Sequence, residues 1–138
     1  MQVQPYLFFD GVCEQALEFY TRMLGAKVGM VMRYKDAPDQ SMVKPGSENK
    51  VMHAAVQIGN STILASDGHC NGTPSFQGFS LSVDAANDAE AKRIFTGLAE
   101  GGKVQMPMDK TFFASSFGMV TDKFGVGWMV IVPLPMKH

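Results

Sequence analysis

The hydrophobic positions at the start of the chain predict a strand, a helix and a second strand. Val3 to Phe9 is apolar and rich in aromatic residues, and the turn sequence Asp10-Gly11 follows it, which is typical of a buried strand. The next twelve residues carry apolar side chains at helical spacing with polar residues on the opposite face, and Gly25 stands where a left-handed C-cap belongs. The apolar stripe comprises Ala16, Phe19, Tyr20 and Met23. Ala26 to Tyr34 is then predicted as a strand.

The rest of the first half predicts a long loop and a β-hairpin. Lys35 to Lys50 contains two prolines and scattered charges, so it buries too little apolar surface for a core segment and is a candidate lid. Val51 to Ile58 and Ser61 to Ser66 are predicted as strands. The short connection Gly59-Asn60 favours an antiparallel hairpin.

The same order of elements is predicted again after a linker rich in Gly, Asn and Pro. Phe79 to Asp84 is a predicted strand, and Asn87 followed by Glu90 fits the capping box of a second helix. The helix has a buried stripe of Ala91, Ile94, Phe95 and Leu98, and it ends before Gly101-Gly102. Three further strands are predicted at Lys103 to Met106, Phe113 to Thr121 and Trp128 to Val132.

The repeated order indicates an internal duplication. The two helix ends are also similar, with FYTRMLGAKV at 19–28 and IFTGLAEGGKV at 94–104. We therefore expect an α+β protein built from two tandem βαβββ modules, with curved mixed sheets around a small-molecule cavity. Module one is expected at about residues 1–67, a linker at 68–77 and module two at about 78–135.

Length and charge restrict the kinds of partner. A chain of 138 residues with 46% hydrophobic residues is long enough for one sizeable core and too short for two ordinary domains. The net charge of −1 provides no basic face, so we expect neither a nucleic acid nor a membrane as partner. The sequence also has no spanning segment or signal peptide, which predicts a cytoplasmic protein with its two cysteines reduced.

Four stretches of the chain carry a resemblance to a known superfamily. They are PYLFFDGVCEQALEFY at 5–20, VMHAAVQIGNSTILASD at 51–67, Gly78-Phe79 opening FSLSVD, and FGMVTDKFGVGWMV at 117–130. Together they resemble the vicinal-oxygen-chelate superfamily of glyoxalase I, bleomycin-resistance proteins and extradiol dioxygenases, and within it the PhnB-like branch. The resemblance implies two sheets that enclose a cavity, and a homodimer.

The resemblance also implies where a metal would bind. In metal-using members, a His or Glu from the first and last strand of each half holds a divalent ion. Here the four positions fall on or next to Pro5, near Ile63 or Leu64, on Phe79 and on Met129. None of these side chains suits an oxygen-activating divalent ion, so we expect no metal and no other cofactor at this site.

Several residues are candidates for chemistry elsewhere. His53 shares a strand face with Gln57 and can serve as a ligand-binding group or general base, or as a hydrogen-bonded histidine at a sheet or subunit contact.

Asp67, His69 and Cys70 lie close together, but a structural zinc needs four ligands and a solvated turn is favoured. Cys13 begins a helix, where the dipole lowers a thiol pKa, but no His neighbours it in sequence and a packed cysteine is favoured.

Two functions are compatible with these observations, and whether any reaction is catalysed stays open. The first is a small-molecule-binding protein without the usual metal, which takes an apolar or aromatic ligand between its sheets. The predicted pocket residues are Pro5, Leu7, His53, Gln57, Phe79, Phe113 and Met129. The alternative is a metal-dependent lyase, isomerase or dioxygenase-like enzyme that uses His53 as base and holds its metal through residues such as Gln57 or Asp67. Methyl transfer is not expected, because no Gly-rich loop follows a strand to hold S-adenosylmethionine.

Overall fold

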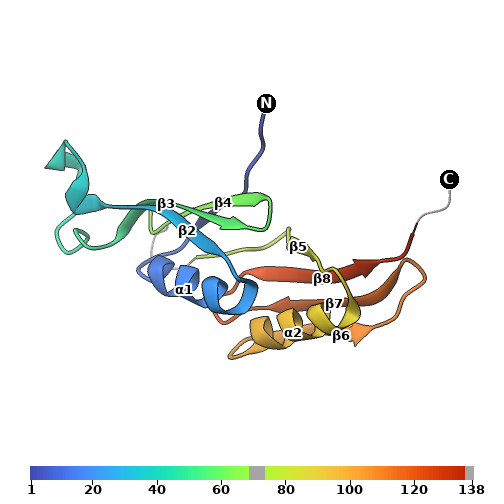
Figure 1. Ribbon diagram of the computed structural model, residues 1–138. Coiled ribbons are helices and arrows are strands. Elements are labelled where there is room, and N and C mark those ends of the chain that lie inside the picture. The colour runs from blue at the N-terminus through green and yellow to red at the C-terminus, as the bar shows by residue number, and fades with distance from the viewer. Residues whose placement is uncertain (69–73, 136–138) are drawn as a thin grey trace. The chain divides into compact units, whose positions relative to one another are not determined.

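The computed structural model describes residues 1–68 and 74–135, and it divides the chain into two compact units (Figure 1). The units are Met1–Pro74 and Ser75–His138. Each unit contains a strand, a helix and three further strands in this order, apart from two short 3-10 turns in the first. Two α+β units of the βαβββ type are therefore present, as the repeated sequence pattern predicts.

The first unit forms a four-stranded mixed sheet with strand order β1-β4-β3-β2. Strand β1 runs parallel to β4, and the other neighbours are antiparallel. Its elements are β1 (Tyr6–Phe8), α1 (Cys13–Leu24), β2 (Lys27–Arg33), β3 (Val51–Ile58) and β4 (Ser61–Ser66). The predicted bounds of the β3–β4 hairpin are confirmed. The candidate lid contains two short 3-10 helices, η1 (Tyr34–Asp36) and η2 (Gln40–Met42).

Helix α1 packs on one face of this sheet because both surfaces are apolar at matching positions. The buried helix residues are Cys13, Ala16, Leu17, Phe19 and Tyr20. The buried sheet residues alternate along their strands and include Leu7, Ala54, Val56, Ile63 and Ala65. Gly25 ends the helix with φ 67°, and its N–H donates to the carbonyl of Thr21, as the predicted C-cap requires. The opposite face of the sheet is thus left for other contacts.

The second unit repeats this topology with strand order β5-β8-β7-β6, and β5 is parallel to β8. Its elements are β5 (Leu81–Asp84), α2 (Asp88–Ala99), β6 (Lys103–Asp109), β7 (Ala114–Thr121) and β8 (Gly127–Pro133). The predicted apolar stripe of α2 is confirmed, because all four of its residues are buried. The predicted helix start is confirmed as well, since the side chain of Asn87 accepts a hydrogen bond from the N–H of Glu90 at 2.9 Å.

The strand predicted from Phe79 begins two residues later, at Leu81. Leu81 pairs with Trp128 near the start of β8, so Phe79 would have to pair with Val126. The backbone of Val126 is already bonded within the turn that precedes β8, because its N–H donates to the Asp122 carboxylate and its carbonyl accepts from the N–H of Asp122. Phe79 therefore lies outside the sheet. No helix in the described part of the chain is long and apolar enough to cross a membrane.

Candidate functional site

The face of the first sheet turned away from α1 combines aromatic, aliphatic and polar side chains. Tyr6 lies opposite Leu64, and Leu64 lies opposite Ala55 on β3. The Tyr6 ring stacks on that of Phe8, with their centroids 4.7 Å apart. His53 lies two residues before Ala55 on β3, so it shares this face. Ser66, which is paired with Phe8, and Thr62, which is paired with Gln57, lie on this face as well. The face therefore carries several polar groups, and one of them joins two strands through their side chains.

That polar group is a tyrosine–histidine pair. The Tyr6 hydroxyl and His53 Nδ1 are 2.9 Å apart, and both residues are half-buried. This hydrogen bond fixes the imidazole ring and uses its Nδ1 atom. Nε2 of His53 makes no hydrogen bond to any other residue in the described ranges, so it is the imidazole atom that can donate to or accept from a bound molecule.

The other predicted pocket residues of the first unit differ in position and in exposure. Leu7 is 1% exposed and is buried on the opposite face, which α1 covers, so it belongs to the core. Gln57 lies on the same face of β3 as His53, two residues beyond Ala55, but it is exposed and its side-chain amide donates to the carbonyl of Gly59 in the hairpin turn at 3.1 Å. Pro5 precedes β1, and its carbonyl accepts from the N–H of Leu64 at 2.9 Å. His53 is the member of the predicted set whose side chain is hydrogen-bonded to Tyr6.

The three predicted residues of the second unit lie in different parts of it. Met129 lies on β8 between Ser82 and Met119, on the sheet face turned away from α2. Phe113 contacts Phe112 and Phe117 edge to face, with ring centroids 5.1 and 5.3 Å apart. Phe79 is 48% exposed and precedes the sheet.

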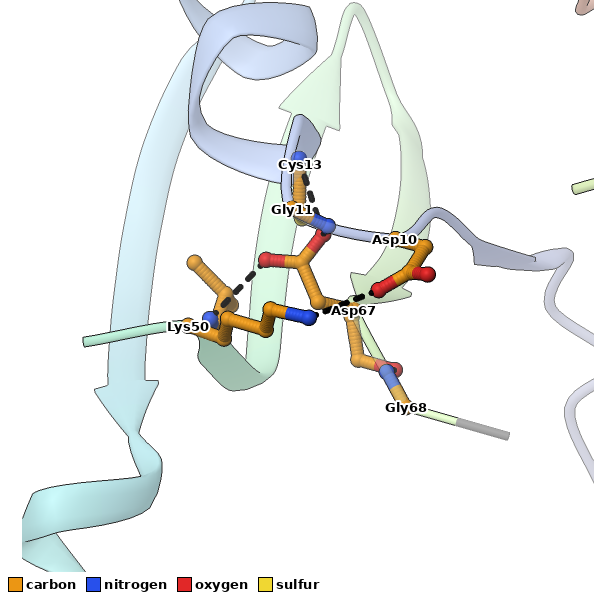
Figure 2. A network of polar contacts seen from close by, with 8 residues as sticks. Asp10, Gly11, Cys13, Lys50, Asp67 and Gly68 are labelled. Atoms are coloured by element: carbon orange, nitrogen blue, oxygen red, sulfur yellow. Dashed lines mark hydrogen bonds and ion pairs between the residues drawn. The ribbon is translucent and has the colours of Figure 1, made fainter. Parts of the chain in front are cut away.

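Asp67 anchors the start of α1 (Figure 2). Its Oδ1 atom accepts hydrogen bonds from the N–H groups of Gly11 and Cys13, at 2.7 and 3.0 Å. Its Oδ2 atom accepts from the N–H of Val51 at 3.0 Å, and the residue is 7% exposed. Because three backbone donors engage both oxygens, this carboxylate joins three chain segments. The sequence suggests Asp67 only as a possible metal ligand and gives no indication that it holds these chain segments together.

Cys13 is shielded from the chemistry that its helix position suggests. Burial, then the negative charges of Asp67 and Glu14, raises the pKa of its thiol to about 12. These effects outweigh the helix dipole, which alone would lower the pKa. The thiol is protonated at neutral pH, and Cys13 is a packed residue.

No metal cluster is present in the part of the chain that the structure describes. Within residues 1–68 and 74–135, no group of three or more His, Cys, Asp or Glu side chains is placed to hold an ion. His69 and Cys70 lie outside the described residues, so the turn predicted there is not placed.

A second buried carboxylate organises the turn between β7 and β8. Asp122 is 3% exposed, and its Oδ1 atom accepts from the N–H groups of Phe124 and Val126 at 2.8 and 3.1 Å. Its Oδ2 atom accepts from Nε1 of Trp128 at 2.9 Å. The turn sequence predicts a structural role here, but the indole contact is visible only in the structure.

A groove of about 480 Å³ lies on the α1 side of the first sheet, on the face opposite His53. Its apolar lining consists of Leu17, Val28, Val31 and Val51, and its polar lining of Glu14, Glu18, Thr21 and Arg22. Glu14 also forms an ion pair with Arg33 of β2. The apolar stripe predicted for the helix does not include Leu17, and the sequence pattern gives no indication of a hollow here.

Comparison with solved structures first defines the class. The fold is that of the glyoxalase/bleomycin-resistance/dioxygenase proteins. It is shared, for example, with a glyoxylase/bleomycin resistance protein/dioxygenase domain from Frankia sp. EAN1pec, which has a TM-score of 0.63 and 16% identity and covers 100% of this chain and 96% of that one. At this identity the likeness concerns the fold alone.

The family follows from closer relatives. The chain belongs to the family described as 3-demethylubiquinone-9 3-methyltransferase, whose model matches residues 1–131. It is 40% identical to Protein YjdN of Escherichia coli K12, over 96% of this chain and 95% of that protein.

Two solved structures support this assignment. Protein PA1353 of Pseudomonas aeruginosa is 41% identical with a TM-score of 0.85, over 96% of this chain and 98% of that one. A PhnB protein of Bacillus cereus is described as a putative 3-demethylubiquinone-9 3-methyltransferase. It is 27% identical with a TM-score of 0.80, over 96% of this chain and 99% of that one. The PhnB-like resemblance stated from the sequence is confirmed.

Proposed function

We propose that this protein binds a small apolar or aromatic molecule without a divalent metal, and that the Tyr6–His53 surface of the first sheet forms part of the binding site. The observation that carries the proposal is the hydrogen bond between the side chains of Tyr6 and His53, beside the Phe8 ring. Small-molecule sites typically combine apolar walls with a few fixed polar groups. A planar molecule with one hydrogen-bonding group fits this chemistry, because His53 Nε2 would bind that group beside the aromatic rings.

The donor sets available for a divalent ion support a metal-free mode of binding. The metal positions implied by the superfamily carry Leu64 and Met129 on the strands themselves, and neither suits a hard or borderline ion. Of the substitute ligands, Asp67 is engaged by three backbone N–H groups and Gln57 by the hairpin turn. The alternative of a metal-dependent enzyme therefore has no observation in its favour.

Methyl transfer, which the family description names, is not part of the proposal. A cofactor with a phosphate or nucleoside group is often bound by a Gly-rich turn that leads from a strand into a helix. Here the turn between β1 and α1 contains Gly11, whose N–H donates to the carboxylate of Asp67, as does the N–H of Cys13. Two backbone donors of this turn are thus already used within the chain.

A ligand screen by thermal shift, followed by calorimetry, tests the proposal. Planar aromatic compounds with one hydroxyl or carboxyl group are expected to raise the melting temperature of the folded protein. Tyr6→Phe retains the ring and removes the hydroxyl, so it is expected to weaken binding of a hit by about 1 kcal/mol, roughly fivefold. His53→Ala is expected to weaken the same hit further.

The control is Glu18→Gln at the polar edge of the α1 groove, which should leave binding unchanged. A hit that responds to Glu18→Gln and not to Tyr6→Phe would place the ligand in the groove and contradict the proposed surface. Metal analysis of protein purified without chelators supplies an independent check. A stoichiometric divalent ion that is lost in His53→Ala would contradict the metal-free mode.

A further inference from the structure

Three methionines lie in a row across the second sheet. Met106 on β6 is paired with Met119 on β7, and Met119 is paired with Met129 on β8. Opposed residues of neighbouring strands project to the same face. The register of β6 shifts on both sides of Met106, and Met106 remains the partner of Met119 between these shifts. Ser82 on β5 continues the row beyond Met129. We refer to Met106, Met119 and Met129 as the methionine row.

The row lies on the face turned away from α2. Gly118 is the residue between Met119 and Phe117 on β7, and a Cβ built on it would come within 2.7 Å of Phe95 of the helix. Gly118 therefore faces α2, and Met119, the next residue along the strand, faces the other way. The Sδ atom of Met108 lies at the Gly118 position, 2.6 Å from the same built Cβ, so Met108 belongs to the helix side. Met106, two residues earlier, is on the other face because the register of β6 shifts between Met106 and Asp109, and Met106 is paired with Met119.

The three side chains are free to converge on one point. Met106 is 45% exposed, and Met119 and Met129 are half-buried. A methionine side chain is unbranched with three rotatable bonds, so the two outer sulfurs can turn toward the central one. The outer strands are two strand spacings apart, about 9.6 Å, which two such side chains and a shared ion can span.

Thioether sulfur is a neutral, soft donor. It favours Cu(I) and ions like it over Mg²⁺, Ca²⁺ or Mn²⁺, which prefer oxygen ligands. Asp84 follows Ser82 by two residues on β5, on the same face, and its carboxylate supplies a negative charge diagonal to Met129. We propose that Met106, Met119 and Met129 form a binding site for one soft monovalent cation of the Cu(I) and Ag(I) class. This site lies within the second unit and does not depend on the proposed ligand surface of the first.

Methyl-¹³C methionine labelling with silver nitrate in chloride-free buffer tests the proposal. The chain has eleven methionines, and each labelled methyl group reports on its own sulfur once Met→Leu variants have assigned the signals. Silver is added to three equivalents, enough for the two cysteines and one further site. The signals of the methionine row are expected to shift together along one saturation curve, while that of Met23 in α1 does not move.

Variants separate the row from general thioether binding. Met119→Leu keeps the side-chain volume close to that of Met and is expected to lower the silver affinity of the other two methionines at least tenfold. Met106→Leu on the exposed edge strand must also lower it, which covers the case in which Met119→Leu perturbs folding. Met23→Leu is the matched control and should change nothing. The proposal is overturned if the three signals stay unmoved at three equivalents, if they shift at different silver concentrations, or if Met106→Leu leaves the affinity of the remaining pair unchanged.

Discussion

The two units begin their helices in different ways although their connectivity is the same. Helix α1 follows Val12, whose side chain makes no cap, and the carboxylate that accepts from the first turn comes from Asp67 beyond β4. Helix α2 follows Asn87, whose own side chain accepts from Glu90 three residues later. One helix start therefore depends on tertiary structure and the other on local sequence. The same backbone plan can be stabilised by either route.

The exposed chemistry of the two sheets differs as well. On the face away from its helix, the first sheet presents the Tyr6–His53 pair beside aromatic rings, and the second presents the methionine row. Both sheets have the same strand order, and in each the first strand of the unit runs parallel to its last strand. Two units of the same connectivity thus each bury one sheet face under a helix and carry different donor groups on the other.

The largest expected effect concerns the thiol at the start of α1. With its pKa raised to about 12, Cys13 should react with iodoacetamide at pH 8 roughly a thousandfold more slowly than a free cysteine, before any steric protection is counted. The measurement uses Cys70→Ser, in which Cys13 is the only thiol, and mass spectrometry follows alkylation. The same variant in urea should react at the ordinary rate. Alkylation of the folded protein at that ordinary rate would show that the thiol is not shielded.

Removing the remote anchor of α1 should cost the most stability. Asp67→Ala leaves three backbone N–H groups without their acceptor, and the expected loss is about 3 kcal/mol of the free energy of unfolding. Urea denaturation followed by circular dichroism measures it. Asp10→Ala removes the nearby ion-pair partner of Lys50 and serves as the control, with an expected change below about 1 kcal/mol. Equal effects of the two variants would contradict the anchoring role of Asp67.

The buried carboxylate of the second unit offers a smaller test. Trp128→Phe removes the indole N–H that donates to Asp122 and leaves a small cavity, while the two backbone donors to Asp122 remain. We expect a loss of about 2 kcal/mol, which the same denaturation experiment measures. A loss below that of Asn87→Ala would mean that the indole contact contributes little.

The local cap of α2 should have the smallest effect of the series. Asn87→Ala removes one side-chain acceptor at an exposed helix start, and the expected loss is about 1 kcal/mol. Asn87→Asp preserves the acceptor and should restore most of the stability. If Asn87→Ala destabilised the protein as much as Asp67→Ala, the contrast between local and remote capping would be wrong.

Strong local periodicity made much of the fold predictable. The bounds of β3 and β4, the left-handed cap at Gly25 and the buried stripe of α2 all follow from patterns within about a dozen residues. The start of β5 does not follow from such a pattern. The residue that Phe79 would pair with, Val126, is already hydrogen-bonded within a turn that is nearly fifty positions away in sequence. Local patterns contain no information about such a partner.

The candidate site was less predictable than the fold. The sequence pattern indicates His53 as a candidate site residue. It does not indicate Tyr6, and it favours Leu7, the next residue on β1, as a pocket residue. Tyr6 and Leu7 both have largely apolar side chains, so alternation alone does not say which of the two faces the helix. The role of Asp67 needed the positions of Gly11, Cys13 and Val51, which lie 16 to 56 residues from it along the chain.

That long separation also orders events during synthesis. A ribosome delivers the α1 segment first, and the carboxylate that holds its first turn emerges more than fifty residues later. Until then the nascent helix has no side-chain cap of its own and is only marginally stable in isolation. The first turn of α1 therefore gains its acceptor late, and a chain interrupted before residue 67 lacks that group.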